Sequence, residues 1–237
     1  MVASETRVAL IIGASGGIGA AVARRLGAEG YRLVLVARSE DRLRATAAGL
    51  AAEGRPDASV VPCDVTQGEA VRTMVEQVEN RLGRIDVLVN SAGINRPGLF
   101  QRLRPDDWEE VLRVNLTGVM LTTQAVLRVM RRQRAGTILT IASLAGRQGR
   151  EGMSSYCASK FAVVGLMDTL RREVERLGIR VTTILPGEVD TAMHGGDPQA
   201  GARRIAPEDV ALAVSFALNL SDRAVLPEIG LYNRAAE

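Results

Sequence analysis

The chain alternates between short apolar runs and longer segments in which apolar residues recur at helical spacing. The apolar runs are residues 7–12, 32–37, 58–62, 86–90, 136–142, 180–185 and 226–232. The helical segments lie near residues 18–29, 40–52, 67–82, 106–132, 154–177 and 207–219. Almost continuously apolar strands, each followed by a helix, are typical of a parallel sheet with helices on both faces. The sequence therefore predicts a doubly wound α/β fold with about seven strands.

The 237 residues contain no internal repeat, no low-complexity tract and no linker, so we expect one domain over residues 1–237. No apolar run reaches the length of a membrane-spanning helix, and the first run is too short for a signal segment. We therefore expect a cytoplasmic protein without a membrane partner. Residues 192–204 lack periodicity and are rich in glycine, which predicts a mobile loop within the domain.

Composition argues against two further classes of partner. The net charge is only +3, and the arginines are spread along the chain between acidic residues. Nucleic-acid binding usually needs a concentrated basic stripe with aromatic side chains, whereas aromatic residues make up 3% of this chain. We therefore expect no nucleic-acid partner. Two cysteines and a single histidine, His194, are too few for a disulfide framework or a metal site, so we expect no metal.

A glycine-rich turn follows the first predicted strand, with the spacing G-x-x-x-G-x-G over residues 13–19. Glycine there lets the backbone approach a pyrophosphate at the N-terminus of the next helix, where free N–H groups and the helix dipole favour an anion. Glycine in such a turn can also serve tight packing alone. Because this turn follows the first strand of an alternating chain, we interpret it as the dinucleotide site of a Rossmann-like fold.

The end of the second predicted strand indicates which dinucleotide binds. An acidic residue at this point would accept hydrogen bonds from the adenosine ribose of NAD. Here Ala37 stands in its place and Arg38 follows. A guanidinium suits a 2′-phosphate because it can donate two parallel hydrogen bonds, although Arg38 could also be a solvated residue at a strand end. We predict a preference for NADP(H), with NAD(H) as the alternative.

The only lysine of the chain, Lys160, follows Tyr156 by four residues at the start of a predicted helix, so the two side chains share a helix face. All the other long cationic side chains are arginine. A phenol, with its ordinary pKa of about 10, is a poor acid–base catalyst at neutral pH. A nearby ammonium stabilises the phenolate and lowers that pKa. We therefore predict that Tyr156 is an acid–base catalyst and that Lys160 lowers its pKa.

These motifs together resemble the short-chain dehydrogenases/reductases, in their compact single-domain form, over nearly the whole chain. "IGASGGIG" is similar to the family's glycine motif T-G-x-x-x-G-x-G, with Ile12 in place of the threonine. "NSAG" resembles the family's N-N-A-G, with Ser91 in place of the second asparagine. We expect both substitutions to affect only structural hydrogen bonds. Further family motifs match in the same order at "CDVT", "RVNLTG", "TIASLAG", "YCASK" and "PGEVDT".

The resemblance implies a catalytic set and a cofactor site. The catalytic residues that it implies are Asn115, Ser143, Tyr156 and Lys160. The residues implied to bind the cofactor are Gly13, Ser15, Gly17, Ile18, Gly19, Arg38, Asp64, Val65, Asn90, Ala92, Gly93, Tyr156, Lys160, Pro186, Gly187, Val189 and Thr191. In this scheme the cofactor carries the hydride and Tyr156 exchanges a proton with the substrate oxygen. Ser143 would hydrogen-bond that oxygen, Lys160 would also hold the nicotinamide ribose, and Asn115 would position a water linked to the lysine.

The substrate is where the sequence leaves alternatives. We expect a small carbonyl compound or alcohol, in contact with residues 94–100, 144–153 and the substrate loop 192–204. The last predicted strand lacks the glycine-rich ending usual in acyl-carrier-protein ketoreductases of the family, but a 3-oxoacyl-thioester reductase remains an alternative. A non-catalytic NADPH-binding sensor is a second alternative, although such proteins usually lose the tyrosine or the lysine.

The anionic character of the substrate and the oligomeric state are two further questions. The sequence leaves open whether Arg147 or Arg150 contacts an anionic substrate. The resemblance also implies a homodimer or homotetramer that packs through the helices at 106–132 and 154–177, the first of which carries more apolar residues than one sheet face needs.

Overall fold

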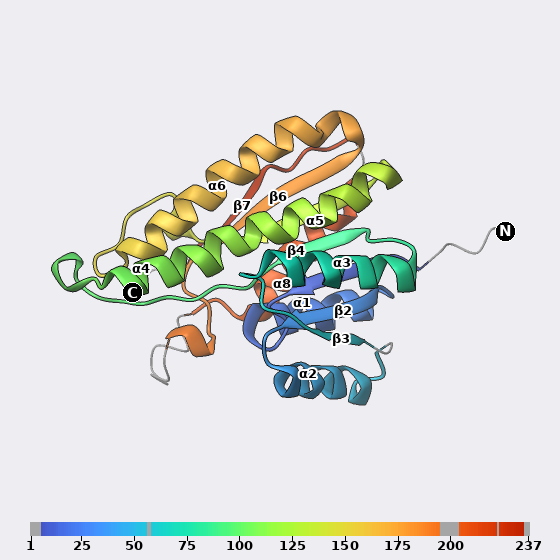
Figure 1. Ribbon diagram of the computed structural model, residues 1–237, viewed down its shortest axis with the longest axis horizontal. Helices are drawn as coiled ribbons and strands as arrows, with labels where there is room; N and C mark the ends of the chain where they lie inside the picture. The colour runs from blue at the N-terminus through green and yellow to red at the C-terminus, as the bar shows by residue number, and fades with distance from the viewer. Residues whose placement is uncertain (1–5, 56–57, 195–203, 222, 235–237) are drawn as a thin grey trace.

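Within the residues that the structure describes, seven parallel strands form one sheet at the centre of the protein (Figure 1). This computed structural model describes residues 6–55, 58–194, 204–221 and 223–234. The strands lie in the order β3-β2-β1-β4-β5-β6-β7. Their bounds are β1 (Val8–Ile12), β2 (Arg32–Ala37), β3 (Ser59–Pro62), β4 (Val87–Asn90), β5 (Gly136–Ile141), β6 (Ile179–Pro186) and β7 (Glu228–Leu231). The predicted doubly wound α/β fold is confirmed.

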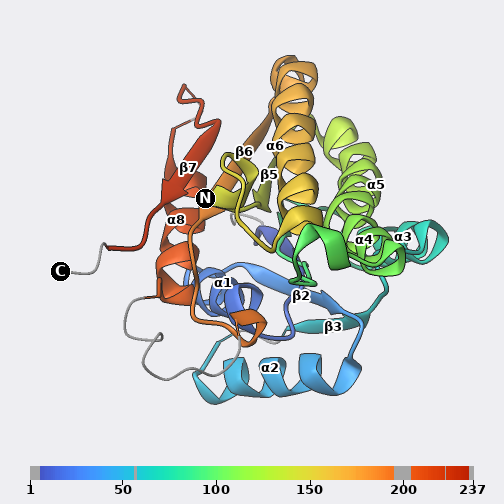
Figure 2. The same ribbon diagram turned by 90° about the vertical axis from the view of Figure 1, so that its left-hand side faces the viewer.

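Helices cover both faces of this sheet, as the two views in Figures 1 and 2 show. One face carries α1 (Gly17–Ala28), α2 (Glu40–Ala52) and α8 (Pro207–Asn219). The other face carries α3 (Gly68–Leu82), α5 (Gly118–Gln133) and α6 (Ser154–Val174). Single 3₁₀ turns span Phe100–Arg102, Leu144–Gly146, Glu175–Leu177 and Ala192–His194.

The central strand β1 explains why the sheet needs two covering layers. Val8, Leu10 and Ile12 belong to the core under α3, α5 and α6. Ala9 and Ile11 point the other way, into the core under α1, α2 and α8. Because successive side chains of a strand point to opposite faces, a strand buried on both faces must be apolar at every position, as this run is.

The strand order places a ligand site at the carboxyl ends of β1 and β4. β2 and β3 lie on one side of β1, and β4 to β7 lie on the other. Open parallel sheets bind their ligands in the crevice at the point where the order reverses in this way. The segments that follow β1 and β4 therefore frame the expected site.

The predicted helix over 106–132 is interrupted in the structure. α4 spans Pro105–Leu112, a π-helical turn spans Arg113–Thr117, and α5 then begins at Gly118. A single π-helical turn inside a helix accommodates an extra residue and often marks a functional site. α4 packs against α6, whereas α5 packs against α3. The turn therefore allows the two halves of this long helical segment to pack against two different helices, α6 and α3.

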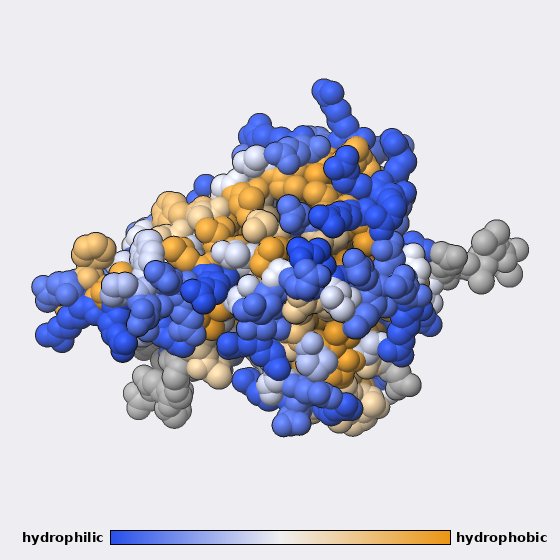
Figure 3. All heavy atoms as spheres, viewed as in Figure 1, coloured by the Kyte–Doolittle hydropathy of each residue, from blue (hydrophilic) through white to orange (hydrophobic). Residues whose placement is uncertain are grey.

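Most of the face in Figure 3 is polar, but an apolar area lies between α6 and α5. Met120 of α5 and Phe161 of α6 are 37% and 48% exposed. Of the helices in the described ranges, none has the length and apolar character needed to cross a bilayer. Most of the predicted loop 192–204 lies outside the described residues.

Candidate active site

Two glycines of the glycine-rich motif have no room for a side chain, Gly13 in the turn after β1 and Gly19 in the first turn of α1. Gly13 has a φ of +83°, and a Cβ there would lie 2.6 Å from the backbone nitrogen of Ala92. A Cβ at Gly19 would overlap the carbonyl oxygen of Gly13. α1 begins at Gly17 without a side-chain cap, which leaves the N–H groups of its first turn available to an anion.

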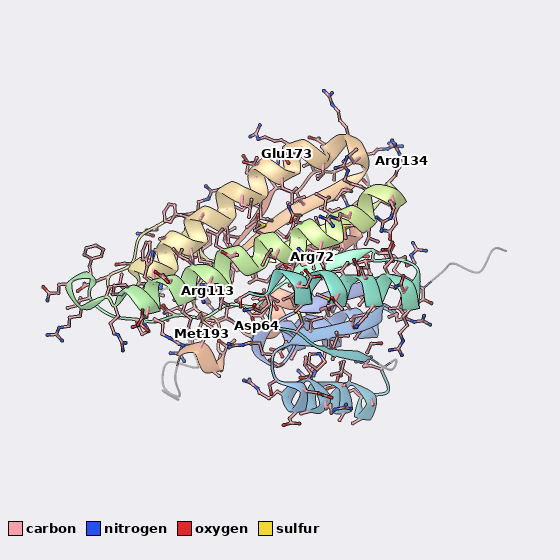
Figure 4. All side chains as sticks on the ribbon, in the orientation of Figure 1. Asp64, Arg72, Arg113, Arg134, Glu173 and Met193 are labelled. Carbon is pink, nitrogen blue, oxygen red and sulfur yellow. The ribbon has the colours of Figure 1, made fainter. Side chains whose placement is uncertain are left out.

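A cleft with a volume of about 530 Å³ opens beside this turn. It is framed by the segments that follow β1, β2, β3, β4 and β6. Asp64 and Met193, labelled in Figure 4, both line it. The predicted cofactor residues that line the cleft are Gly13, Ser15, Gly17, Ile18, Gly19, Arg38, Asp64, Val65, Ala92, Gly93 and Thr191.

The side chain of Asn90, also predicted to bind the cofactor, turns away from this cleft. It is 2% exposed, and its amide nitrogen donates to the hydroxyls of Thr123 (3.0 Å) and Thr140 (3.3 Å). Its Oδ1 accepts a 2.8 Å hydrogen bond from the hydroxyl of Thr122. Asn90 thus ties β4 to α5 and β5, and it is not among the residues that line the cleft.

Of the predicted cofactor residues after β6, one faces the glycine turn and the others lie in the core or beside Ser143. Thr191 faces the glycine turn, because its Cγ2 lies 3.1 Å from the position that a Cβ would take at Gly17. Val189 is 4% exposed and belongs to the core under α1, α2 and α8. Pro186 and Gly187 end β6 beside Ser143, whose hydroxyl donates to the Pro186 carbonyl oxygen at 3.4 Å.

Ser143 and Tyr156 meet at the end of β5 and the first turn of α6. Ser143 follows β5, and its Oγ accepts a 3.1 Å hydrogen bond from the backbone nitrogen of Ala145. The Ser143 hydroxyl is also hydrogen-bonded to the Tyr156 phenol. Burial raises the pKa of Tyr156, while the Ser143 hydrogen bond and the charge of Arg150 act in the lowering direction. The structure therefore holds a buried, protonated phenol beside a fixed hydroxyl.

Lys160 lies behind the phenol ring of Tyr156. Its Nζ is 5.5 Å from the ring centroid and donates a 3.0 Å hydrogen bond to the carbonyl oxygen of Ile141. The residue is 5% exposed, and burial lowers the pKa of its ammonium to about 8. We predicted that Lys160 would lower the pKa of Tyr156, but the net shift is upward. The reason is that burial of the phenol raises its pKa by more than the Ser143 hydrogen bond and the charge of Arg150 lower it. The Lys160 ammonium is not among the influences that lower this pKa.

Asn115 occupies the π-helical turn and is completely buried. Its Oδ1 accepts from the backbone nitrogen of Ile94 at 2.8 Å, and its Nδ2 donates to the Ile94 carbonyl oxygen at 2.9 Å. Nδ2 also donates to the Ser159 hydroxyl at 3.1 Å, which in turn donates to the Tyr156 carbonyl oxygen at 2.7 Å. The amide thus fixes the segment after β4 to the start of α6, next to Tyr156.

The sequence comparison agrees with this geometry. A family model described as short chain dehydrogenase matches residues 7–200. The chain belongs to the short-chain dehydrogenases.

Relatives within the family match over almost the full length. A 3-oxoacyl-[acyl-carrier-protein] reductase of Haemophilus influenzae is 36% identical, with 90% of each chain covered. The alcohol dehydrogenase of the archaeon Thermococcus sibiricus, solved with 5-hydroxy-NADP, is 32% identical with a TM-score of 0.90, covering 98% of this chain and 100% of that one. A single-residue variant of the actinorhodin polyketide ketoreductase, solved with NADPH, is 34% identical with a TM-score of 0.89 over 97% of each chain.

The departure of this short-chain dehydrogenase from the family motif at Ser91 has a clear structural role. The Ser91 hydroxyl donates a 2.7 Å hydrogen bond to the carbonyl oxygen of Ile12. Its backbone nitrogen donates to the same oxygen at 3.0 Å. Ser91 thus ties the end of β4 to the end of β1, and the expectation that it affects a structural hydrogen bond is confirmed.

Arg147 and Arg150, considered from the sequence as contacts for an anionic substrate, are both in ion pairs. Arg147 reaches Glu228 of β7 at 2.6 Å, and Arg150 reaches Glu188 after β6 at 2.9 Å. The Glu188 backbone is held in turn by Asn233, whose amide accepts from its N–H (2.8 Å) and donates to its C=O (2.9 Å). These contacts join the segments around Tyr156 to the last strand.

Sequence reasoning missed Arg42, which lines the cleft together with Arg38. We assigned the scattered arginines to solvated helix faces, and Arg42 was treated as one of them. A signal was present, because Arg42 lies in the first turn of the helix that begins two residues after Arg38.

Proposed function

We propose that this short-chain dehydrogenase is an NADP(H)-dependent oxidoreductase that interconverts a carbonyl compound and a secondary alcohol. The observation that carries the proposal is the placement of Ser143, Tyr156 and Lys160. The serine hydroxyl bonds the phenol, and the buried ammonium lies behind the ring, close to the glycine-turn cleft. The solved relatives with NADPH and 5-hydroxy-NADP support the choice of cofactor.

The residues around the cleft fit a phosphorylated dinucleotide. Gly16 and Gly17 line the cleft without a side chain, so the backbone there can approach a phosphate, and the first turn of α1 suits a pyrophosphate. Arg38 would bind the 2′-phosphate, Asp64 and Val65 would flank the adenine, and Lys160 would hold the nicotinamide ribose. When bound, the nicotinamide supplies or accepts the hydride.

Tyr156 would act as the proton donor in the reduction. Its phenolic proton would pass to the carbonyl oxygen of the substrate as the hydride reaches the carbonyl carbon, which yields the alcohol and a phenolate. Ser143 would hydrogen-bond the same oxygen and hold it against the phenol. Because burial raises the pKa of Tyr156, the phenol is protonated at neutral pH, which favours the donor role. The reverse reaction needs the phenolate, so its rate should increase with pH.

The substrates that we propose are small ketones, hydroxy acids and alcohols. A 3-oxoacyl thioester is the second candidate, because the reductase of Haemophilus influenzae acts on that class by its name and is 36% identical. A panel of both substrate classes with NADPH and NADH, followed by the absorbance of the nicotinamide, separates the two candidates.

The decisive variant is Tyr156→Phe, which removes the transferable proton and keeps the ring. We expect turnover to fall by roughly a thousandfold, the order associated with loss of an acid–base catalyst, while the Kd for NADPH changes less than about threefold. NADPH binding by the wild type without turnover of any substrate would instead support a non-catalytic sensor. Near-normal turnover by the variant would contradict the assigned role of Tyr156.

We also infer that the chain assembles as a homodimer or homotetramer through α5 and α6. The exposed Met120 and Phe161 on these helices, and the apolar area between them in Figure 3, support this surface. Sedimentation at micromolar concentration that detects only the 25.3 kDa chain would contradict the inference.

A further inference from the structure

The side chain of Asn233, two residues beyond the end of β7, holds the backbone of Glu188, two residues beyond the end of β6. Asn233 Oδ1 accepts a 2.8 Å hydrogen bond from the Glu188 N–H, and its Nδ2 donates a 2.9 Å hydrogen bond to the Glu188 carbonyl oxygen. That oxygen also accepts from the backbone nitrogen of Ile205 at 2.8 Å. The backbone of Glu188 is therefore fixed both by the chain that follows β7 and by the segment before α8.

The residue before Glu188 makes room for this amide. A Cβ at Gly187 would overlap the Oδ1 atom of Asn233. The Gly187 N–H donates to the Leu231 carbonyl oxygen at 2.8 Å, which holds the ends of β6 and β7 together. An amide side chain carries one acceptor and one donor group side by side, as the pair of hydrogen bonds to Glu188 requires. The contact therefore depends on a glycine at one position and an amide at the other.

The segment that Asn233 fixes runs along the proposed active site. It begins at Pro186, whose carbonyl oxygen accepts from the Ser143 hydroxyl. It reaches Thr191, whose Cγ2 lies 3.1 Å from the position that a Cβ would take at Gly17. The catalytic hydroxyls mark the reacting end of the site and the glycine turn marks the pyrophosphate end, so the nicotinamide half of a bound cofactor would lie along this segment. Glu188 lies between the two ends.

The side chain of Glu188 extends the connection toward Tyr156. Its Oε1 accepts a 2.9 Å hydrogen bond from Nη1 of Arg150. The carbonyl oxygen of Arg150 accepts from the backbone nitrogen of Met153 at 3.2 Å, and Met153 packs against Tyr156 in a small apolar cluster. Through one residue, Asn233 is thus connected to the cofactor side of the site and to the proton donor.

We propose that Asn233 is a positioning residue for hydride transfer, which acts by setting the position of Glu188 along the segment that borders the nicotinamide. Hydride transfer needs the reacting atoms about 3–3.5 Å apart, and a misplacement of about 1 Å can lower a rate about a hundredfold. The inference rests on the proposed function, because it assumes that a nicotinamide cofactor binds here. It adds a role for a residue that is not among those that line the cleft.

Binding measurements test the inference without catalysis. NADPH carries the nicotinamide half, whereas 2′,5′-ADP represents only the adenosine half. Titration calorimetry on full-length Asn233→Ala should show an affinity for NADPH about threefold weaker than that of the wild type and an unchanged affinity for 2′,5′-ADP. The matched control is Asn219→Ala, which removes an asparagine whose amide bonds the Ser215 carbonyl oxygen at 2.9 Å at the end of α8. It should change neither affinity.

Single-turnover kinetics give the second readout, because they report hydride transfer apart from binding and product release. The oxidation of bound NADPH by a carbonyl substrate should be about tenfold slower in Asn233→Ala, while the stoichiometry of NADPH binding stays that of the wild type. A merely structural loss would lower the stoichiometry and leave the rate per bound NADPH unchanged. Asn233→Ser should behave like Asn233→Ala, because a hydroxyl is too short to reach both groups of Glu188.

The outcomes separate the inference from the proposed function. Equal changes of affinity for NADPH and 2′,5′-ADP, or an unchanged single-turnover rate, would overturn the inference. Both results leave the proposed function intact, since the wild type still binds NADPH and reduces its substrate. A wild type that does not bind NADPH, or that binds it without reducing any carbonyl compound, would overturn the proposed function and the inference together.

Discussion

Replacing Lys160 by methionine should stabilise the folded protein at neutral pH while abolishing its activity. Burial holds the pKa of this ammonium at about 8, whereas the reference value for lysine is 10.5. At neutral pH the ammonium is charged in both the folded and the unfolded chain, so the folded state carries the full cost of burying it. A shift of this size corresponds to roughly 3 kcal/mol.

The pH dependence gives this cost a distinct signature. Between about pH 8 and 10.5 the unfolded chain binds more protons at Lys160 than the folded chain, so the free energy of unfolding rises with pH through that window. Methionine has a similar length and no charge, and it removes this contribution. The stability of the wild type relative to Lys160→Met should therefore increase by roughly 2 kcal/mol from about pH 7 to about pH 9.5. The variant also loses the hydrogen bond to Ile141, which offsets part of its advantage at neutral pH.

Urea unfolding at a series of pH values and one protein concentration measures these differences. The fluorescence of Trp108, the only tryptophan, and far-UV circular dichroism provide two probes. Arg172→Met, which removes a 70% exposed cation from the same helix, is the control and should follow the wild-type pH profile. Parallel profiles for wild type and Lys160→Met would show that burying the ammonium costs nothing and would refute the reasoning. Turnover should be lost in Lys160→Met, because the variant lacks the ammonium that we propose to hold the nicotinamide ribose.

The remaining predictions concern the cofactor cleft. Ala37→Asp should reverse the preference in kcat/KM from NADPH to NADH, and Arg38→Ala should raise KM for NADPH about tenfold; a wild-type preference for NADH would contradict both. Gly13→Ala should lower the melting temperature and abolish NADPH binding, because its Cβ would lie 2.6 Å from the backbone nitrogen of Ala92. Gly30→Ala shares the strained backbone, with a φ of +81°, but has open space, so it should lose only about 1 kcal/mol of stability and keep its binding.

The strands and most helices were predictable because their signals are local. The run at β1 is apolar at every position, which only a strand covered on both faces requires. The glycine spacing likewise predicted the dinucleotide turn, and the spacing of Tyr156 and Lys160 predicted that these two side chains lie together. In both cases the residues that carry the signal are close together in the sequence.

Other features depend on partners far away in the sequence. The π-helical turn could not be seen in the periodicity of 106–132, because the side chain it accommodates, Asn115, bonds Ile94, which lies outside that segment. The inward orientation of Asn90 depends on threonines of α5 and β5. The raised pKa of Tyr156 follows from burial, which a helix-face argument about Lys160 does not include.

The π-helical turn also marks where this part of the chain can change length. Because the turn accommodates one extra residue, deleting one residue from Arg113–Thr117 would restore regular α-helical bonding and leave α4 and α5 with the faces that they now present to their neighbours. A deletion in the first half of α5 would instead rotate everything beyond it by about 100° and turn Val126 and Met130 away from the sheet. In an alignment of relatives, a gap of one residue is therefore compatible with this structure within these five residues but not within α5.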